Sequence, residues 1–358
     1  MYLLRPLILS LVIFGSLFFV SCDSSDEAAL AEIELDLQIT RVDSMMWAYA
    51  QAYQKDTTIN PYVAFNEYLG TEKAFLYEYL NMEEVARTRR LSVAYVDTLM
   101  MAQLSSVLKE KAMIDLLDTV REVFPYEEDL SSPLIKPLKR LKLAFPEIEI
   151  PAFKTMVNGY VPGGDMRTAD QVVPLPNYIS LGLHYLMGRK FPYYPVNISA
   201  YQKRQFDREA LPVELMREIA DGMVSPIPSQ QTPNLLSGMI RAGIKQYFLE
   251  KMVPNSPDSL RLRYSAPQTQ WAQSFEGRIY KELLDKMFSS DFKDQREYLS
   301  EKPYTTTLSM DSAPRIGEYC GWKIVQSYMK GHPEVSLADL CNMQDYEKIL
   351  RESKYKPS

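Results

Sequence analysis

The chain has 358 residues, 46% of them hydrophobic, and a formal net charge of −6 at pH 7. A chain of this length can bury a sizeable core, either as one domain or as two packed lobes, 31–150 and 151–358. Its mild acidity argues against nucleic-acid binding, which requires a basic face.

The first 21 residues predict a secretory signal peptide. Arg5 precedes an unbroken apolar run from Pro6 to Val20, which is short for a membrane span and typical of a signal peptide. The ending Ser21-Cys22 resembles a bacterial lipobox, so Cys22 would receive a diacylglycerol after cleavage. A signal anchor with an incidental cysteine is the alternative. Residues 22–30 are acidic and predict a flexible tether between the lipid and the folded part.

The remaining sequence predicts an α+β fold that is mostly helical. Apolar and polar residues alternate over 33–39, which predicts a half-buried strand at the front of the folded part. Helices interrupted by prolines follow from 60 to 144, and the last of them is basic, with its lysines most simply explained as a solvated face. Strands are expected again at 152–157 and 177–186.

Residues 234–253 predict the central core helix. Their apolar side chains recur at three- and four-residue spacing, so one continuous face would be buried. Asn234 can cap the free N–H groups of the first turn, and Pro254 ends the helix.

Two later helices are expected, one from 271 to about 288 and one after Pro314. In the second of these, Gly317 and Gly321 lie on one face and would allow another backbone to approach closely. Cys320 and Cys341 could form a disulfide in an oxidising compartment, but two buried unpaired thiols are favoured.

An aromatic loop follows the strand at 177–186, and it supplies the candidate partner-binding residues. Tyrosines in a loop are either packed onto the core or presented to a partner, and the sequence does not distinguish these roles. The candidates are Tyr185, Phe191, Tyr193 and Tyr194. The neighbouring His184 is expected to have a hydrogen-bonded structural role rather than to bind a ligand.

Several motifs together resemble the GldB-type gliding-motility lipoproteins of Bacteroidota. They are Cys22 behind a signal peptide, the segments 178–188, 239–245 and 316–325, Trp271, and the end at 353–357. The resemblance covers about residues 30–358. It implies a lipid-anchored envelope protein that faces the periplasm, is required for gliding and type IX protein secretion, and has no established enzymatic activity. It also implies a partner protein in that machinery.

That family in turn looks like a distant relative of predicted zinc peptidases, in which H-E-x-x-H is followed by E-G-x-A on a later helix. Glu276 stands at the third-ligand position of this pattern, whereas Met239, Ile240 and Gly243 stand where the two histidines and the general base would be. The resemblance therefore implies a non-catalytic, zincin-like scaffold without metal or cofactor, with a small β-sheet packed on helix 234–253. An envelope hydrolase with an unrecognised active site is the alternative.

A peptidase-like scaffold would keep the surface on which an extended peptide adds to a sheet edge, because that main-chain pairing needs no catalytic residue. The strand 178–186, the loop 191–194 and the helix that carries Met239 and Gly243 are expected to line this surface. We therefore expect a partner protein to bind there.

Overall fold

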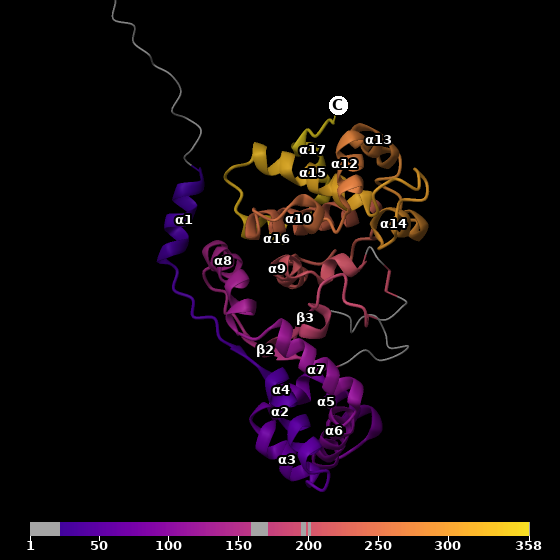
Figure 1. The fold of residues 1–358 in the computed structure, drawn as a ribbon. Coiled ribbons are helices and arrows are strands. Elements are labelled where there is room, and N and C mark those ends of the chain that lie inside the picture. Colours follow the sequence, from indigo (N-terminus) through magenta and orange to yellow (C-terminus); the bar gives the residue numbers. More distant parts are fainter. Residues whose placement is uncertain (1–21, 159–170, 195–197, 200–201, 358) are drawn as a thin grey trace, which may run out of the picture.

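The computed structural model describes residues 22–158, 171–194, 198–199 and 202–357, so the expected signal peptide at 1–21 lies outside the described residues (Figure 1). Helices dominate and one small sheet accompanies them, which confirms the mostly helical α+β class. The α-helices are α1 Cys22–Glu32, α2 Val42–Lys55, α3 Pro61–Tyr68, α4 Lys73–Tyr79, α5 Met82–Arg89, α6 Val93–Leu108, α7 Lys111–Val123, α8 Glu128–Ala144, α9 Leu211–Met223, α10 Leu235–Met252, α11 Asp258–Arg261, α12 Ala266–Ser274, α13 Glu276–Leu284, α14 Phe292–Leu299, α15 Ile316–Gly331, α16 Leu337–Asn342 and α17 Tyr346–Ser353. The strands are β1 Ile39–Thr40, β2 Ala152–Met156, β3 Val172–Pro174 and β4 Tyr178–Gly182.

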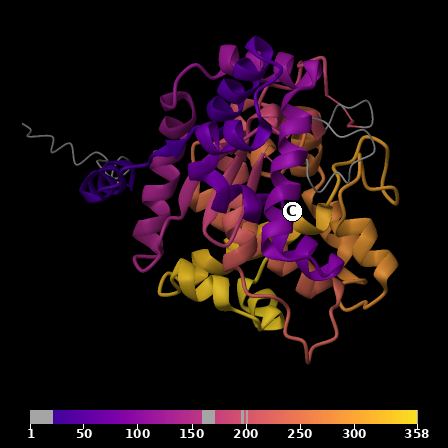
Figure 2. The same ribbon diagram turned by 90° about the horizontal axis from the view of Figure 1, so that it is seen from below.

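The first helix corrects the expectation of a flexible tether. Residues 22–32 form α1, which lies at the margin of the molecule in both views (Figures 1 and 2). The Nζ of Lys136 on α8 pairs with Glu27 at 3.0 Å, and Lys139 donates to the carbonyl of Leu30 at 3.1 Å. An acidic helix therefore docks on the basic helix α8, which gives some of the α8 lysines a partner inside the chain.

The sheet has the strand order β1-β2-β4-β3, with β1, β2 and β4 parallel and β3 antiparallel to β4. The predicted strand 177–186 ends at Gly182 and continues as a 3₁₀ turn, Leu183–Tyr185. Because β4 is paired on both sides, it offers no free edge to a peptide. The expectation that this strand lines a strand-addition surface is therefore wrong.

The alternating segment at 33–39 becomes a strand only at its end. Apolar side chains from Ile33 to Leu37 are half-buried while the polar residues between them are exposed, as the alternation predicts. Only Ile39 and Thr40 pair with β2, however, so the expected strand is too long. The alternation of apolar and polar residues indicates which side of a segment is buried, whereas a strand also requires hydrogen bonds to a neighbouring backbone.

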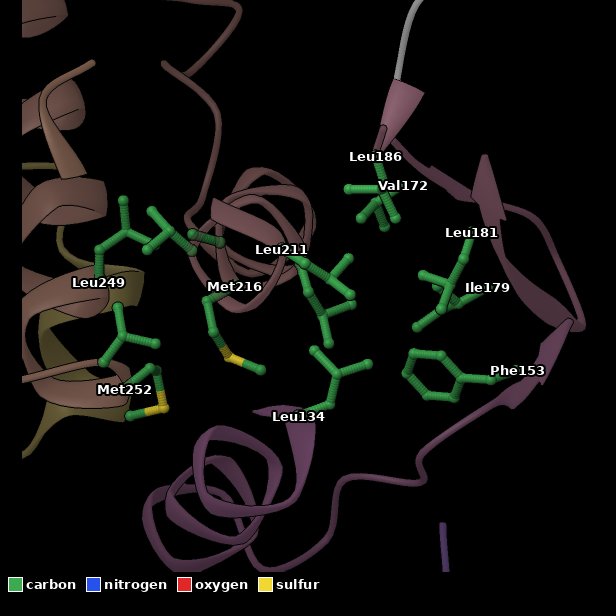
Figure 3. Close-up of a cluster of buried hydrophobic side chains, with 14 of the residues drawn as sticks. Leu134, Phe153, Val172, Ile179, Leu181, Leu186, Leu211, Met216, Leu249 and Met252 are labelled. Atoms are coloured by element: carbon green, nitrogen blue, oxygen red, sulfur yellow. The ribbon is translucent and has the colours of Figure 1, made fainter. Parts of the chain in front are cut away.

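Helices α8 and α9 lie between the sheet and α10 (Figure 3). Phe153 and Ile179 of the sheet lie on one side of α9, and Leu249 and Met252 of α10 lie on the other. The expectation of a sheet packed directly on helix 234–253 is therefore wrong, because α9 buries side chains around most of its circumference and supplies the middle layer. Most of the buried apolar side chains form one cluster that includes residues from both 31–150 and 151–358.

The predicted core helix is confirmed as α10. The Asn234 side chain accepts from the backbone N–H of Ser237 at 2.9 Å, and the Ser237 hydroxyl accepts from the backbone N–H of Asn234 at 3.1 Å. This reciprocal cap satisfies two donors and is worth about 1 kcal/mol. The helix ends just before Pro254.

Helix α15 crosses α10 at a pair of glycines, which confirms the close approach predicted from Gly321. A Cβ on Gly321 would overlap the Met239 carbonyl group, with the carbonyl carbon at 2.5 Å. A Cβ on Gly243 would overlap the Gly321 carbonyl and lie 2.6 Å from the Trp322 nitrogen. Gly317 instead receives α14, where a Cβ would lie 3.0 Å from the Tyr298 carbonyl oxygen. The two long helices are thus in backbone contact at residue 243.

Candidate functional site

The three residues at the degenerate peptidase positions are buried beneath α15. Met239 and Ile240 have no exposed surface, and Gly243 contacts the α15 backbone. The expectation that Met239 and Gly243 line an accessible surface is therefore wrong, since α15 packs directly against this part of α10. Met239 and Ile240 contribute hydrophobic packing, and the absence of a side chain at Gly243 allows the close helix contact.

Glu276 is held by two phenols. The predicted helix at 271–288 is divided into α12 and α13 at Phe275, and Glu276 is the first residue of α13. Its Oε2 accepts from the hydroxyl of Tyr319 at 2.8 Å, and its Oε1 accepts from the hydroxyl of Tyr355 at 2.7 Å. Burial, and then the hydrogen bond to Glu276, raises the pKa of both tyrosines, which keeps them protonated as donors. Both carboxylate oxygens of Glu276 are therefore hydrogen-bonded within the protein.

The carboxylate of Glu276 thus joins α13 to α15 and to the C-terminal segment. Hydrogen bonds to a charged group each contribute about 1.5–3 kcal/mol, so the two bonds of Glu276 stabilise the packing of these three elements. Within the part of the chain that the structure describes, no cluster of three or more His, Cys, Asp or Glu side chains has the geometry of a metal site. Cys320 and Cys341 are buried and unpaired, as favoured from the sequence.

The aromatic loop divides into buried and exposed members. Tyr185 and Tyr194 are 6% and 3% exposed and pack with Phe206 and Ile198 in a small separate cluster, against which Phe191 also packs. Tyr193, by contrast, is 73% exposed. Tyr185 and Tyr194 therefore hold the loop in place through this small cluster, whereas the side chain of Tyr193 is exposed to solvent.

His184 lies next to this cluster and is fully buried. Burial lowers the pKa of its imidazole to about 3, and a hydrogen bond with the Met156 backbone opposes part of that shift. The imidazole is therefore neutral in the folded protein at neutral pH, which agrees with a structural role.

A cavity of about 860 Å³ lies between the segments 187–190, 204–209 and 257–267, next to the aromatic loop. Gly188 turns the chain here with a φ of +86°, which favours glycine. Arg189 then folds back, so that its Nε donates to Asp207 at 2.6 Å and its backbone N–H donates to the same carboxylate at 2.8 Å. Lys190 and Glu214 also line the cavity. It is a concave, charged surface.

A buried network of charges forms one wall of this cavity. Glu214 is 3% exposed and accepts from the Nε of Arg263 at 3.2 Å, while Arg217 lies 3.5 Å from it. Burial alone would raise the pKa of Glu214, but the charges of Arg263 and Arg217 outweigh it and hold the pKa below its usual range. The network continues from Arg217 to Glu318 at 3.9 Å.

Arg315 completes the network on its inner side. It lies 2.7 Å from Glu301 and 3.3 Å from Glu318. Both Arg263 and Arg315 adopt left-handed backbone conformations, with φ of 54° and 46°, which cost a non-glycine residue about 1–2 kcal/mol. The surrounding ion pairs hold these conformations in place.

Sequence reasoning missed this network entirely. Glu214, Arg263 and Glu318 come from α9, from the turn after α11 and from α15, and no spacing connects such distant segments. The guanidinium and carboxylate groups neutralise one another, so the wall offers a pre-organised polar surface rather than a free acid or base.

Comparison with known families resolves the identity of the chain. The family described as "Gliding motility protein GldB" matches residues 23–357, which is nearly the whole length. The chain belongs to the GldB family. Searches of curated proteins and of solved structures find no match.

Family membership makes this GldB-family protein a gliding-motility lipoprotein of the cell envelope. Among the described residues, no helix combines the length and apolar character that crossing a membrane requires. The match includes the whole stretch 61–144, so α3 to α8 are part of the family fold.

Proposed function

We propose that this GldB-family protein is a non-catalytic scaffold, anchored by a lipid on Cys22, that binds a protein component of the gliding and type IX secretion machinery from the periplasmic side. The observation that carries the proposal is the backbone contact between α10 and α15. This contact supports the proposal because Met239 and Ile240, which stand at ligand and general-base positions of the peptidase pattern, are completely buried.

The state of Glu276 supports the same proposal. Both oxygens of its carboxylate accept hydrogen bonds from tyrosines of neighbouring elements. A catalytic carboxylate needs at least one oxygen directed at a substrate or a metal-bound water. Here the residue serves to join α13, α15 and the C-terminal segment.

The accessible candidate for partner binding is the rim formed by the aromatic loop and the charged cavity. Tyr193 is exposed at one side, Lys190 and Arg189 lie in the same loop, and the wall at Glu214 is rigidly ion-paired. An exposed tyrosine beside a fixed polar surface suits a protein partner, because the ring supplies contact area with little loss of entropy on binding.

A site-specific photocrosslinker tests this surface. Placed at position 193 of the lipidated protein in gliding cells, it is expected to capture a component of the machinery. The control is position 62 on α3, because Tyr62 is similarly exposed at 62%. Capture at both positions, or at position 62 alone, would place the partner elsewhere and remove the rim from the proposal.

A further inference from the structure

The surface of α13 and α14 exposes a group of large apolar side chains. Phe275, Leu284, Phe288 and Phe292 are 41%, 47%, 61% and 73% exposed, and all lie within a short stretch of chain. The opposite side of α13 buries Ile279 and Leu283 and contacts α15. Phe275 lies one turn before the buried Ile279 and packs against the ring of Trp271, whereas Leu284, Phe288 and Phe292 follow further along the chain. We call these four exposed residues the α13–α14 surface.

Cations surround the α13–α14 surface although the whole chain is acidic. The segments 275–296 and 354–357 together carry seven basic and five acidic residues, a net charge of +2, the acidic ones being Glu276, Glu282, Asp285, Asp291 and Asp294. Six of the basic residues are exposed: Arg278, Lys281, Lys293, Arg296, Lys354 and Lys356. None of the six has a carboxylate of the described residues within ion-pair distance. A net positive charge of this kind favours an anionic partner.

The C-terminal segment brings two of these cations to α13. The ring of Tyr355 packs edge-on against Tyr280 of α13, with centroids 5.3 Å apart, and its hydroxyl donates to Glu276 at 2.7 Å. Lys354 and Lys356 flank this fixed tyrosine and are exposed. Their positive charges are thus held beside the apolar face.

The position of α1 indicates which end of the molecule would face a membrane. In Figure 1 the first turn of α1 lies at the same end of the molecule as α12, α13 and α17, α14 lies nearer the level of α10, and α3 lies at the other end. Because α1 is docked on α8, the lipid proposed on Cys22 would be held at that end. A membrane that carries the lipid would therefore face α13.

We infer that the α13–α14 surface is a second membrane contact, which inserts Phe288 and its apolar neighbours at the headgroup level of an anionic phospholipid bilayer. Exposed phenylalanine and leucine together with lysine and arginine on one face are the features of segments that lie in a membrane interface. One acyl chain anchors only marginally, so a basic patch strengthens anchoring and also fixes the orientation of the domain. This inference rests on the proposed lipid at Cys22 and is independent of the proposed partner.

Vesicle sedimentation with the full chain from residue 22, carrying Cys22→Ser so that no acyl chain is present, tests the contact directly. We expect binding to phosphatidylglycerol-containing vesicles and little to pure phosphatidylcholine, with binding lost at high salt. Lys281→Ala is expected to weaken binding about fivefold, which corresponds to about 1 kcal/mol per cation near an anionic surface. Phe288→Ser should weaken it as well.

Tyr62→Ser is the matched control, because Tyr62 on α3 is as exposed as Phe288, at 62% against 61%. It is expected to leave vesicle binding unchanged. Absence of binding to anionic vesicles, or equal effects of the two substitutions, would overturn the inference. Capture of a protein at position 288 without vesicle binding would also overturn it, and would assign the surface to a protein.

Orientation is measured with the lipidated protein in vesicles. Cys320 and Cys341 are buried, so a fluorophore on Phe288→Cys or Tyr62→Cys labels one position. We expect brominated phospholipids to quench the label at 288 and to leave the label at 62 unquenched. Equal quenching at both positions, or none at 288, would refute the orientation.

Discussion

Substitution of Gly321 by alanine tests the closed contact between α10 and α15. The new Cβ would lie 2.5 Å from the Met239 carbonyl carbon, and ordinary contact begins at 3.4 Å. The backbones would therefore have to separate by about 1 Å, at a cost of about 1–3 kcal/mol or more for overpacking. In an unobstructed helix the same change stabilises by about 1 kcal/mol.

Gly222→Ala is the control, because its Cβ on α9 would meet nothing within 4 Å. The assay is urea unfolding, which compares the free energies of unfolding of both variants with that of the wild type. We expect Gly321→Ala to lose at least about 2 kcal/mol and Gly222→Ala to lose none. Equal stability of the two variants would refute the backbone contact, and with it the argument that the peptidase position is closed.

Three further predictions concern the loop, the buried histidine and the anchor. Tyr194→Ala should lose about 3–5 kcal/mol in thermal unfolding, whereas Tyr193→Ala should keep its stability to within about 0.5 kcal/mol and weaken gliding; wild-type gliding of Tyr193→Ala would contradict this. The pKa of His184 falls from 6.5 to about 3 on folding. The stability that the neutral imidazole contributes is therefore complete above pH 6.5, and it declines by about 1.4 kcal/mol per pH unit as the pH falls toward 3. In urea unfolding, His184→Gln should flatten this dependence of the free energy of unfolding on pH. Cys22→Ala should abolish fatty-acid labelling and impair localisation, and undiminished labelling would exclude lipidation at this residue.

Local signals in the sequence predict the helices better than they predict the neighbours of each element. The Asn234 cap, the apolar period of α10 and the glycine spacing of α15 are properties of single segments, so they can be recognised without the fold. The layer formed by α9 between the sheet and α10 depends on packing between distant segments. No pattern within α9 specifies which elements cover it.

The candidate site shows the same limit. The substitutions at Met239, Ile240 and Gly243 can be read from the sequence, but the helix that closes this position cannot, because it comes from about 80 residues later in the chain. The phenols that hold Glu276 and the ion pairs of Glu214 likewise join distant segments. Tyrosines of the aromatic loop looked equivalent in sequence, and only packing separates the buried Tyr194 from the exposed Tyr193.

Glu276→Gln tests the non-catalytic claim most directly, with Tyr319→Phe and Tyr355→Phe as controls that remove the same hydrogen bonds and keep the carboxylate. Gliding speed is measured at matched protein abundance for all three variants. If Glu276 only joins elements, each tyrosine variant should lose about 1.5–3 kcal/mol, Glu276→Gln should lose no more than the two together, and all three should glide as the wild type does when folded. A folded, abundant Glu276→Gln protein that cannot support gliding, alongside tyrosine variants that can, would show that the carboxylate has a chemical role and would contradict the account.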